Sequence, residues 1–487
     1  MLCSSGAPFV AESFLFFSTM SIHPNLLIVL TRGFRSDAMS DERAWPLSTA
    51  HLEALSRRGI RLAASAASTA DPQALDTLLT GLHARQLGDH LEELCGSNHQ
   101  IEPDERPMSQ RQLKVSVAQY LQQAGYHTAG VGLVRPIITH LDESVCIEDV
   151  DVIRQPRSVE DAYYRHCRKE GLLAAIMQQR VTRQKHGPFA PDRLLLEPAD
   201  DIDGFITRQT LNKIKTMPTD KPWALFVSFS GPDNQLPAPP LYDSLVNPKH
   251  LMDGCTIPDF RKHHPMVQPV YLRTQLQRLE ARAVARIRAD YLARVGMIDY
   301  AMRQIVGEMD QREDCTNTWT CFTSNRGTLL GEHGLIGHQS FYNAAVQVPL
   351  VIAPPRSAPM PHDAIPDGLF STVDFAATLC DLASVKLPKE VTGRSLLPLL
   401  GSVLDDVDDP MGGLLCEFED RTLLETHRYK AIYNRGSNQP TAVFDLLADE
   451  DEKKNLVDSQ LGEDIAEMMM LRLEEATGAL PLPHFSA

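Results

Sequence analysis

The stretch from Cys321 to Pro355 decides the fold, and it reads CFTSNRGTLLGEHGLIGHQSFYNAAVQVPLVIAPP. Its first residues form a short apolar run, which is typical of a buried strand, and a glycine-rich loop follows. The run VPLVI at 348–352 predicts a second buried strand, which Pro354 and Pro355 end. The stretch therefore predicts two buried strands joined by a long polar loop.

The segments before this stretch predict the alternating strands and helices of an α/β domain. The apolar run NLLIVL at 25–30 has the pattern of a central parallel strand covered on both faces. A helix is expected over 51–58, and Gly59 ends it. Further elements are expected as a helix, turn and strand over 114–131, helices over 202–215 and 280–310, and a buried strand over 223–229.

Composition narrows the class of protein. The chain has 487 residues, of which 43% are hydrophobic and 23% charged, as suits one large domain with or without a smaller one. Its formal net charge of −16 argues against a nucleic-acid partner or an anionic membrane surface. The nine cysteines are scattered without CxxC spacing, which favours reduced thiols in a cytoplasmic protein over a disulfide framework or a zinc site.

The first 22 residues do not fit a targeting signal. They contain an apolar patch but lack a positively charged start, and Glu12 interrupts the patch. We expect residues 1–22 to be a disordered or dispensable extension, with Met20 as an alternative start. No apolar run reaches the length of a membrane span, so we expect no membrane partner.

Several motifs together resemble the sulfatase branch of the alkaline phosphatase superfamily. The opening stretch is similar to the family pattern FTSDHGxxLGEHGLxGKxxxYExxxxVPL. Other segments resemble family motifs in the family's order: PNLLIV at 24–29, TADPQALDTLLTGL at 69–82, the segment 114–131, SFSGPDNQLPAPPLY at 228–242, and 369–400. The resemblance implies an alkaline phosphatase-like α/β sandwich, in which a large mixed, mostly parallel sheet lies between helices and a smaller C-terminal subdomain is antiparallel.

The resemblance also implies a domain organisation. After the extension at 1–22, residues 23–400 are expected to form the sulfatase-like α/β domain, with an insertion at about 140–200. Residues 401–487 are expected to form the C-terminal α+β subdomain.

The positions that do chemistry in the family depart from its pattern. Where the resemblance places the ligands of a divalent cation, this chain has Arg32, Gly33, Asn325 and Arg326. Among these side chains only the amide of Asn325 offers an oxygen. We therefore expect no divalent metal at this position.

The nucleophile and substrate positions depart as well. The cysteine that the family oxidises to formylglycine falls on Asp71, so no formylglycine is expected. Read without the family, Asp71 is a helix N-cap and Pro72 the first helical residue. The remaining family site positions fall on Leu75, Leu133 and Arg135, on Asp233 for the leaving-group acid, and on His338 for a sulfate-binding lysine.

The substitutions predict a pseudoenzyme with a degenerate active site. Such a protein would be a binding, regulatory or oligomeric partner, acting as a homo-oligomer, with an active relative or on a small anion. The alternative is a divergent, metal-independent hydrolase of sulfuric or phosphoric esters. In that case Asp71 is the nucleophile, Arg135 with Arg326 holds the anion, and His338 or His127 is the general acid.

A salt-bridged plug would account for the substitutions in the pseudoenzyme. Arginines stand where metal and cationic charge used to be, and new carboxylates can pair with them. The expected plug consists of Arg32, Arg135 and Arg326 with Asp71 and Asp233.

Other polar residues in these motifs are expected to be structural. We expect Asp299 to be an ordinary helix position and Asp374 a helix-end contact, and we expect His127 to be solvated. The pattern leaves His333 open between a scaffold hydrogen-bonding group and a functional one.

Overall fold

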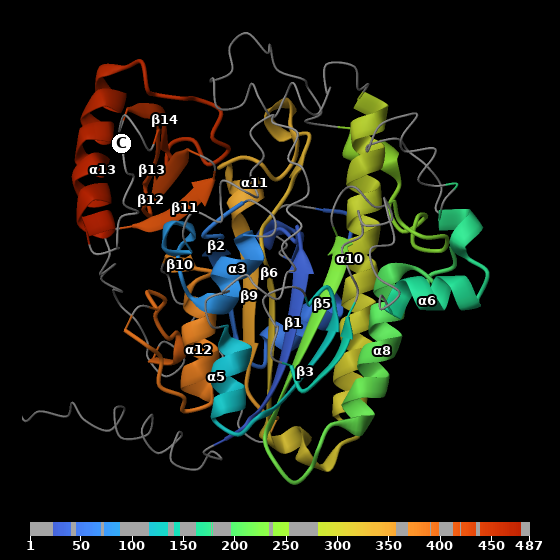
Figure 1. The fold of residues 1–487 in the computed structure, drawn as a ribbon. Coiled ribbons are helices and arrows are strands. Elements are labelled where there is room, and N and C mark those ends of the chain that lie inside the picture. The colour runs from blue at the N-terminus through green and yellow to red at the C-terminus, as the bar shows by residue number, and fades with distance from the viewer. Residues whose placement is uncertain are drawn as a thin grey trace, which may run out of the picture.

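An eight-stranded sheet forms the centre of the computed structural model (Figure 1). The structure describes residues 23–39, 45–69, 73–87, 116–134, 141–146, 162–176, 178, 196–232, 237–252, 281–356, 369–389, 391–398, 413–418, 420–434 and 439–478. The expected extension at 1–22 therefore lies outside the described residues. In the described part of the chain, no helix is both long and apolar enough to cross a membrane.

The strand order of the sheet is β10-β2-β9-β6-β1-β5-β3-β4. Only β9 is antiparallel to its neighbours, so the sheet is mixed but mostly parallel, as expected. The strands are β1 (Asn25–Arg32), β2 (Ile60–Ser65), β3 (His127–Gly132), β4 (Glu143–Cys146), β5 (Trp223–Pro232), β6 (Thr318–Ser324), β9 (Gln347–Ala353) and β10 (Phe370–Ser371). A small hairpin of β7 (Leu329–Leu330) and β8 (Ile336–Gly337) follows β6.

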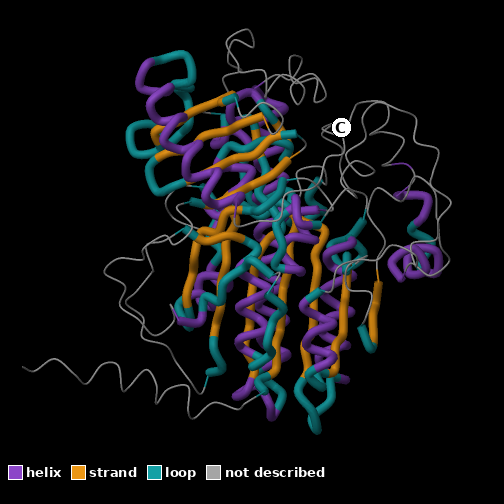
Figure 2. Tube along the Cα trace, turned by 60° about the vertical axis from the view of Figure 1, so that its left-hand side comes forward, coloured by secondary structure: helices purple, strands orange, loops and turns teal. Residues whose placement is uncertain are grey.

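Helices cover both faces of the sheet (Figure 2). Along β1, Leu27 and Val29 face one apolar core, and Leu26, Ile28 and Leu30 face the other. The first core is closed by α2 (Ala50–Ser56), α8 (Ile202–Thr216) and α10 (Ala281–Met309). The second is closed by α3 (Gln73–Thr80), α5 (Val117–Gln123) and α12 (Asp374–Leu382). The apolar run of β1 is therefore buried on both faces, as its sequence predicts.

A second, antiparallel sheet forms the C-terminal part of the chain. Its strands, in order, are β11 (Leu414–Phe418), β12 (Arg421–Glu425), β13 (Tyr429–Asn434) and β14 (Pro440–Asp445). One face packs against α13 (Gln460–Gly478), and the other contributes to the core beside α10. This matches the expected antiparallel subdomain with its helix.

Two buried polar joints fasten this subdomain to the main sheet. Arg85, just beyond α3, pairs with Glu417 of β11 at 2.7 Å, and the Glu417 N–H donates to the Ala67 carbonyl at 3.0 Å. Lys430 of β13 donates to the Phe341 carbonyl at 3.1 Å and pairs with Glu452 at 2.7 Å. Because these charges are buried, removing one partner leaves the other uncompensated.

Little of the expected insertion is described. The described part includes β4, which pairs with β3 in the main sheet, and α6 (Ala162–Lys169), which lies beside α8 in Figure 1. Tyr163 of α6 donates to the Asp200 carbonyl at 2.9 Å, and Cys167, Ile176 and Leu196 form a small apolar cluster.

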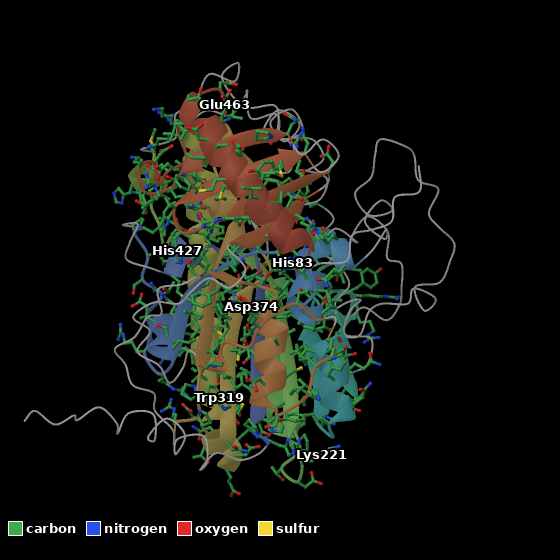
Figure 3. The ribbon with its side chains drawn as sticks, turned by 90° about the vertical axis from the view of Figure 1, so that its left-hand side faces the viewer. His83, Lys221, Trp319, Asp374, His427 and Glu463 are labelled. Atoms are coloured by element: carbon green, nitrogen blue, oxygen red, sulfur yellow. The ribbon has the colours of Figure 1, made fainter. Side chains whose placement is uncertain are left out.

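The junction with the subdomain predicts a pH dependence of stability. His83 lies beneath the C-terminal subdomain in Figure 3, and burial, together with Arg85, lowers its pKa to about 4. Since that pKa lies below the unfolded value of 6.5, the folded state resists protonation, and stability falls as the pH drops from 6.5 towards 4. We expect the wild-type chain to lose about 2 kcal/mol more than His83→Gln between pH 7.5 and pH 5.

Urea unfolding of both chains at the two pH values tests this expectation. An equal loss of stability in the two chains would show that His83 is not the group responsible.

Candidate functional site

The candidate site lies at the carboxyl edge of the four adjacent parallel strands β6, β1, β5 and β3. Ligands of open α/β sheets bind at this edge. The pairing of Thr31 with Ser324 places the ends of β1 and β6 side by side, and the Asn325 N–H donates to the Thr31 carbonyl at 3.1 Å. Arg32 and Asn325, which are far apart in sequence, therefore lie next to each other.

The Ser324 hydroxyl ties the two strand ends together. Its oxygen lies 3.1 Å from the Thr31 carbonyl and 2.8 Å from the Arg326 carbonyl, and it accepts from the Phe34 N–H at 3.0 Å. Gly33, between the two strand ends, has a φ of 76°. A side chain is disfavoured in that conformation, so the backbone turn accounts for glycine at this family metal position.

Arg326 is the most unusual side chain at this edge. It is only 1% exposed, and its Nη1 donates to the Gly327 carbonyl at 3.3 Å. Asn325 is also buried, and Arg32 is partly buried. The structure therefore brings Arg32, Asn325 and Arg326 together. The guanidinium of Arg326 is enclosed by protein.

These residues do not fit the divalent cation that the resemblance implies. A hard divalent cation takes oxygen ligands, whereas a guanidinium carries only donors. Of Arg32, Gly33, Asn325 and Arg326, only Asn325 has a side-chain oxygen. Within the described ranges, no group of three or more His, Cys, Asp or Glu residues could hold a metal ion.

The nucleophile corner is only partly described. Asp71 and Pro72 lie outside the described residues, so the expected N-cap is not tested. The helix α3 is described from Gln73, whose Oε1 accepts from the Ser68 hydroxyl at 2.8 Å. Leu75 packs against the apolar core on this face of the sheet and so adds no charge to the site.

The corner formed by β3 and β5 is held by buried ions. Leu133 is buried in the core, while Arg135 and Asp233 lie outside the described residues. Asp203 accepts from the Ser230 N–H at 2.7 Å and the Gly231 N–H at 3.0 Å at the end of β5. Arg294 of α10 pairs with it at 3.1 Å. Burial and the neighbouring Asp201 raise the pKa of Asp203.

The histidines differ in their relation to the site. His338 is partly buried in the loop after β8. His333 stacks on Tyr342, with ring centroids 3.6 Å apart.

His127 corrects our expectation of a solvated side chain: it is 12% exposed and lies 3.7 Å from Asp142 and 3.5 Å from Glu143. It stands at the amino end of β3, about 17 Å from the candidate edge, so it is misplaced for a general acid there.

Two aspartates have the structural roles expected of them. Asp299 accepts from the backbone N–H groups of His51 and Leu52 at the start of α2. Asp374, labelled in Figure 3, accepts from the Ser371 and Arg394 N–H groups at the start of α12.

Sequence reasoning missed a buried ionic network that supports the end of β1. Arg35 pairs with Asp37 at 2.6 Å and with Glu332 of the GEHG turn at 2.7 Å. The Tyr291 hydroxyl accepts from the Arg35 N–H at 2.9 Å and donates to the Gly33 carbonyl at 3.0 Å. The three charged partners lie in RSDAM at 35–39 and GEHG at 331–334, where no periodic pattern predicts that they meet.

Glu332 is ionised within this network. Burial alone would raise its pKa, but the charge and hydrogen bond of Arg35 lower it to about 2. The same network raises the pKa of Arg35 against the effect of burial. The network therefore joins the exit of β1 to the loop after β7 through fully charged groups.

The comparisons with known proteins agree with this architecture. The sulfatase family model matches residues 24–385, and the model for the C-terminal region of N-sulphoglucosamine sulphohydrolase matches residues 331–478. The solved phosphonate monoester hydrolase of Silicibacter pomeroyi superimposes with a TM-score of 0.73 at 16% identity, over 94% of this chain and 96% of that one.

Curated relatives show the same kinship at the sequence level. The choline-sulfatase of Rhizobium meliloti is 26% identical over 365 residues, which cover 71% of this chain and 67% of the relative. Arylsulfatase K of Gallus gallus is 31% identical over 185 residues, which cover 36% of this chain and 34% of the relative.

The chain therefore has an α/β fold with a mixed, mostly parallel sheet, which it shares with the solved phosphonate monoester hydrolase. Because the family model matches well over half of the sequence, the chain belongs to the sulfatase family.

The Glu332 network predicts a second effect on stability. Glu332→Gln removes the charge that pairs with buried Arg35, and we expect it to lower the free energy of unfolding by about 3 kcal/mol at pH 7. The folded pKa of about 2 lies below the unfolded value of 4.5. The contribution is therefore complete above pH 4.5 and is lost as the pH falls towards 2.

Denaturant titrations at pH 7 and pH 4 measure this difference. Glu170→Gln is the matched control, because Glu170 is exposed and its removal should change stability little. Equal effects of the two substitutions would contradict the structural role of Glu332.

Proposed function

We propose that this sulfatase-family chain does not turn over substrate and acts instead as a binding, regulatory or oligomeric partner. Pairing with an active relative is one form of this role. The observation that carries the proposal is the buried guanidinium of Arg326 at the end of β6, beside Arg32 at the end of β1. The family's cation has its ligands at these positions.

The positive charges of Arg32 and Arg326 support a site without a metal ion. A guanidinium about 5 Å from a divalent ion repels it by about 7 kcal/mol at an effective dielectric of 20. Two such groups oppose metal binding, and Gly33 contributes no side chain against them. The proposal therefore includes no divalent cation as a cofactor.

The nucleophile position supports the same conclusion. The chain has Asp71 there, and a carboxylate cannot be oxidised to formylglycine. Leu75 and Leu133 stand at two positions where the family has cationic groups. An incoming sulfate or phosphate ester would thus meet fewer positive charges from this side than in the family pattern.

We further propose that a salt-bridged plug fills the degenerate site. Arg32, Arg135 and Arg326 are the cations of this plug, and Asp71 and Asp233 are its anions. The burial of Arg326 supports it, because a buried arginine without compensation costs several kcal/mol. A site that takes a small anion in place of these carboxylates is the nearest alternative arrangement.

The proposed cytoplasmic location rests on the cysteines. The described residues contain five free cysteines, and Cys167, Cys321, Cys380 and Cys416 among them are buried. Reduced, buried thiols suit a reducing compartment.

The test combines metal analysis with turnover assays. We expect purified protein to hold no stoichiometric calcium, magnesium, manganese or zinc, and to hydrolyse no aryl sulfate, phosphate or phosphonate ester. The triple substitution Arg32→Asp, Asn325→Asp and Arg326→His removes two cations and supplies new ligands. We expect it to gain calcium affinity by at least about tenfold over the wild-type chain in calorimetric titration.

Two controls make this test decisive. Glu170→Gln, at an exposed position, should leave metal affinity unchanged, and thermal melting reports whether the triple variant is folded. Stoichiometric metal, or turnover that Asp71→Ala abolishes, would overturn the proposal and make the chain a divergent hydrolase.

A further inference from the structure

The outer surface of α13 carries an apolar stripe that no described residue covers. Leu461 is 54% exposed, Met468 38% and Leu471 61%. α13 is the outermost element of the C-terminal subdomain in Figure 1. Exposed apolar side chains gathered on one helix face mark an interaction surface rather than scattered surface residues.

Helix geometry places these three side chains together. At about 100° per residue, Leu461 and Met468 lie about 20° apart around the axis, and Leu471 lies about 60° from Met468. The inner face of the helix is separately occupied, because Ile465, Met469 and Leu473 pack against the C-terminal sheet. The stripe is therefore additional to the face that anchors α13.

The charges beside the stripe are arranged symmetrically about Met468. Asp464 lies four residues before Met468, and Arg472 lies four residues after it. Both are exposed on the stripe's side of the helix. Asp464 accepts from Gln460 at 3.0 Å and remains exposed at the surface.

We propose that this stripe (Leu461, Met468 and Leu471, flanked by Asp464 and Arg472) is the contact between two copies of the chain. The two α13 helices pack antiparallel about a twofold axis through Met468. Asp464 of each copy then faces Arg472 of the other, which gives two ion pairs, and Leu471 packs beside Met468 of the second copy.

Two other acidic residues of α13 lie on different sides of the helix from Met468. Glu463, labelled in Figure 3, lies about 140° around the helix from Met468, and Glu467 about 100°. Both of these carboxylates stand away from the contact. An isologous contact with its own complementary charges fits a second copy better than an unrelated partner.

The contact is expected to be reversible. α13 has 19 residues and is about 28 Å long. One helix from each copy makes an interface smaller than the roughly 1,600 Å² of standard stable complexes. We therefore expect a dimer that dissociates at micromolar concentrations.

Sedimentation of the full chain from about 2 to about 200 µM tests the proposal. We expect the mass to rise from monomer to dimer across this range. Leu471→Glu should weaken the dimer by at least about tenfold. Leu241→Glu, at a leucine of the main domain that is 75% exposed, is the control and should leave the dimer intact.

Charge exchange tests the geometry independently. Asp464→Arg and Arg472→Asp each place like charges opposite one another and should weaken the dimer by at least about tenfold. The double substitution restores the pairs with reversed sign and should recover most of the affinity. All these positions are exposed, so the variants should keep the wild-type melting temperature.

The possible results divide clearly. A dimer that Leu471→Glu weakens and the double exchange restores supports the proposal. A chain that stays monomeric at the highest concentration overturns it, as does a dimer indifferent to these substitutions.

Discussion

The parallel pairing of β1 with β6 is the constraint on which the candidate site depends. It brings residues that are almost 300 positions apart in the sequence to one sheet edge, where Ser324 joins the two strand ends through its hydroxyl. The two apolar cores favour this pairing, because a shift of one residue would exchange the side chains of β1 that pack in each core. Arg32 and Arg326 are therefore neighbours as a consequence of the fold itself.

At this edge, the side chains that hold the strand ends in place differ from those that occupy the candidate site. Arg35, Asp37 and Glu332 form a fully charged network that holds the end of β1 against the loop after β7. That support is made of paired charges, whereas the buried side chain of Arg326 at the same edge carries donors and no acceptor for a cation. A site can thus keep the frame that shapes it while the groups inside the frame change, because different side chains of the same loops perform the two tasks.

The sequence allowed most of the fold to be predicted. Continuous apolar runs such as 25–30 and 223–229 identified buried strands, and the order of the motifs identified the mixed sheet and the antiparallel C-terminal sheet. The network around Arg35 was not predicted, because its charged letters carry no periodic signal and meet only through tertiary packing. For His127 the prediction was wrong, since its side chain lies close to Asp142 and Glu143 at the start of the neighbouring strand β4. At the site, identities could be read from the motifs, but the enclosure of Arg326 required the packed structure.

The joints of the C-terminal subdomain have a consequence for how the chain can be divided. Arg85 belongs to the main domain, yet its carboxylate partner is on β11, and Lys430 of β13 holds the main-domain turn at Phe341. A fragment that stopped near residue 400 would keep Arg85 but lose Glu417 and the C-terminal sheet that bury its guanidinium. The two sheets are separate in topology, but we expect the two parts to unfold together because of these buried contacts.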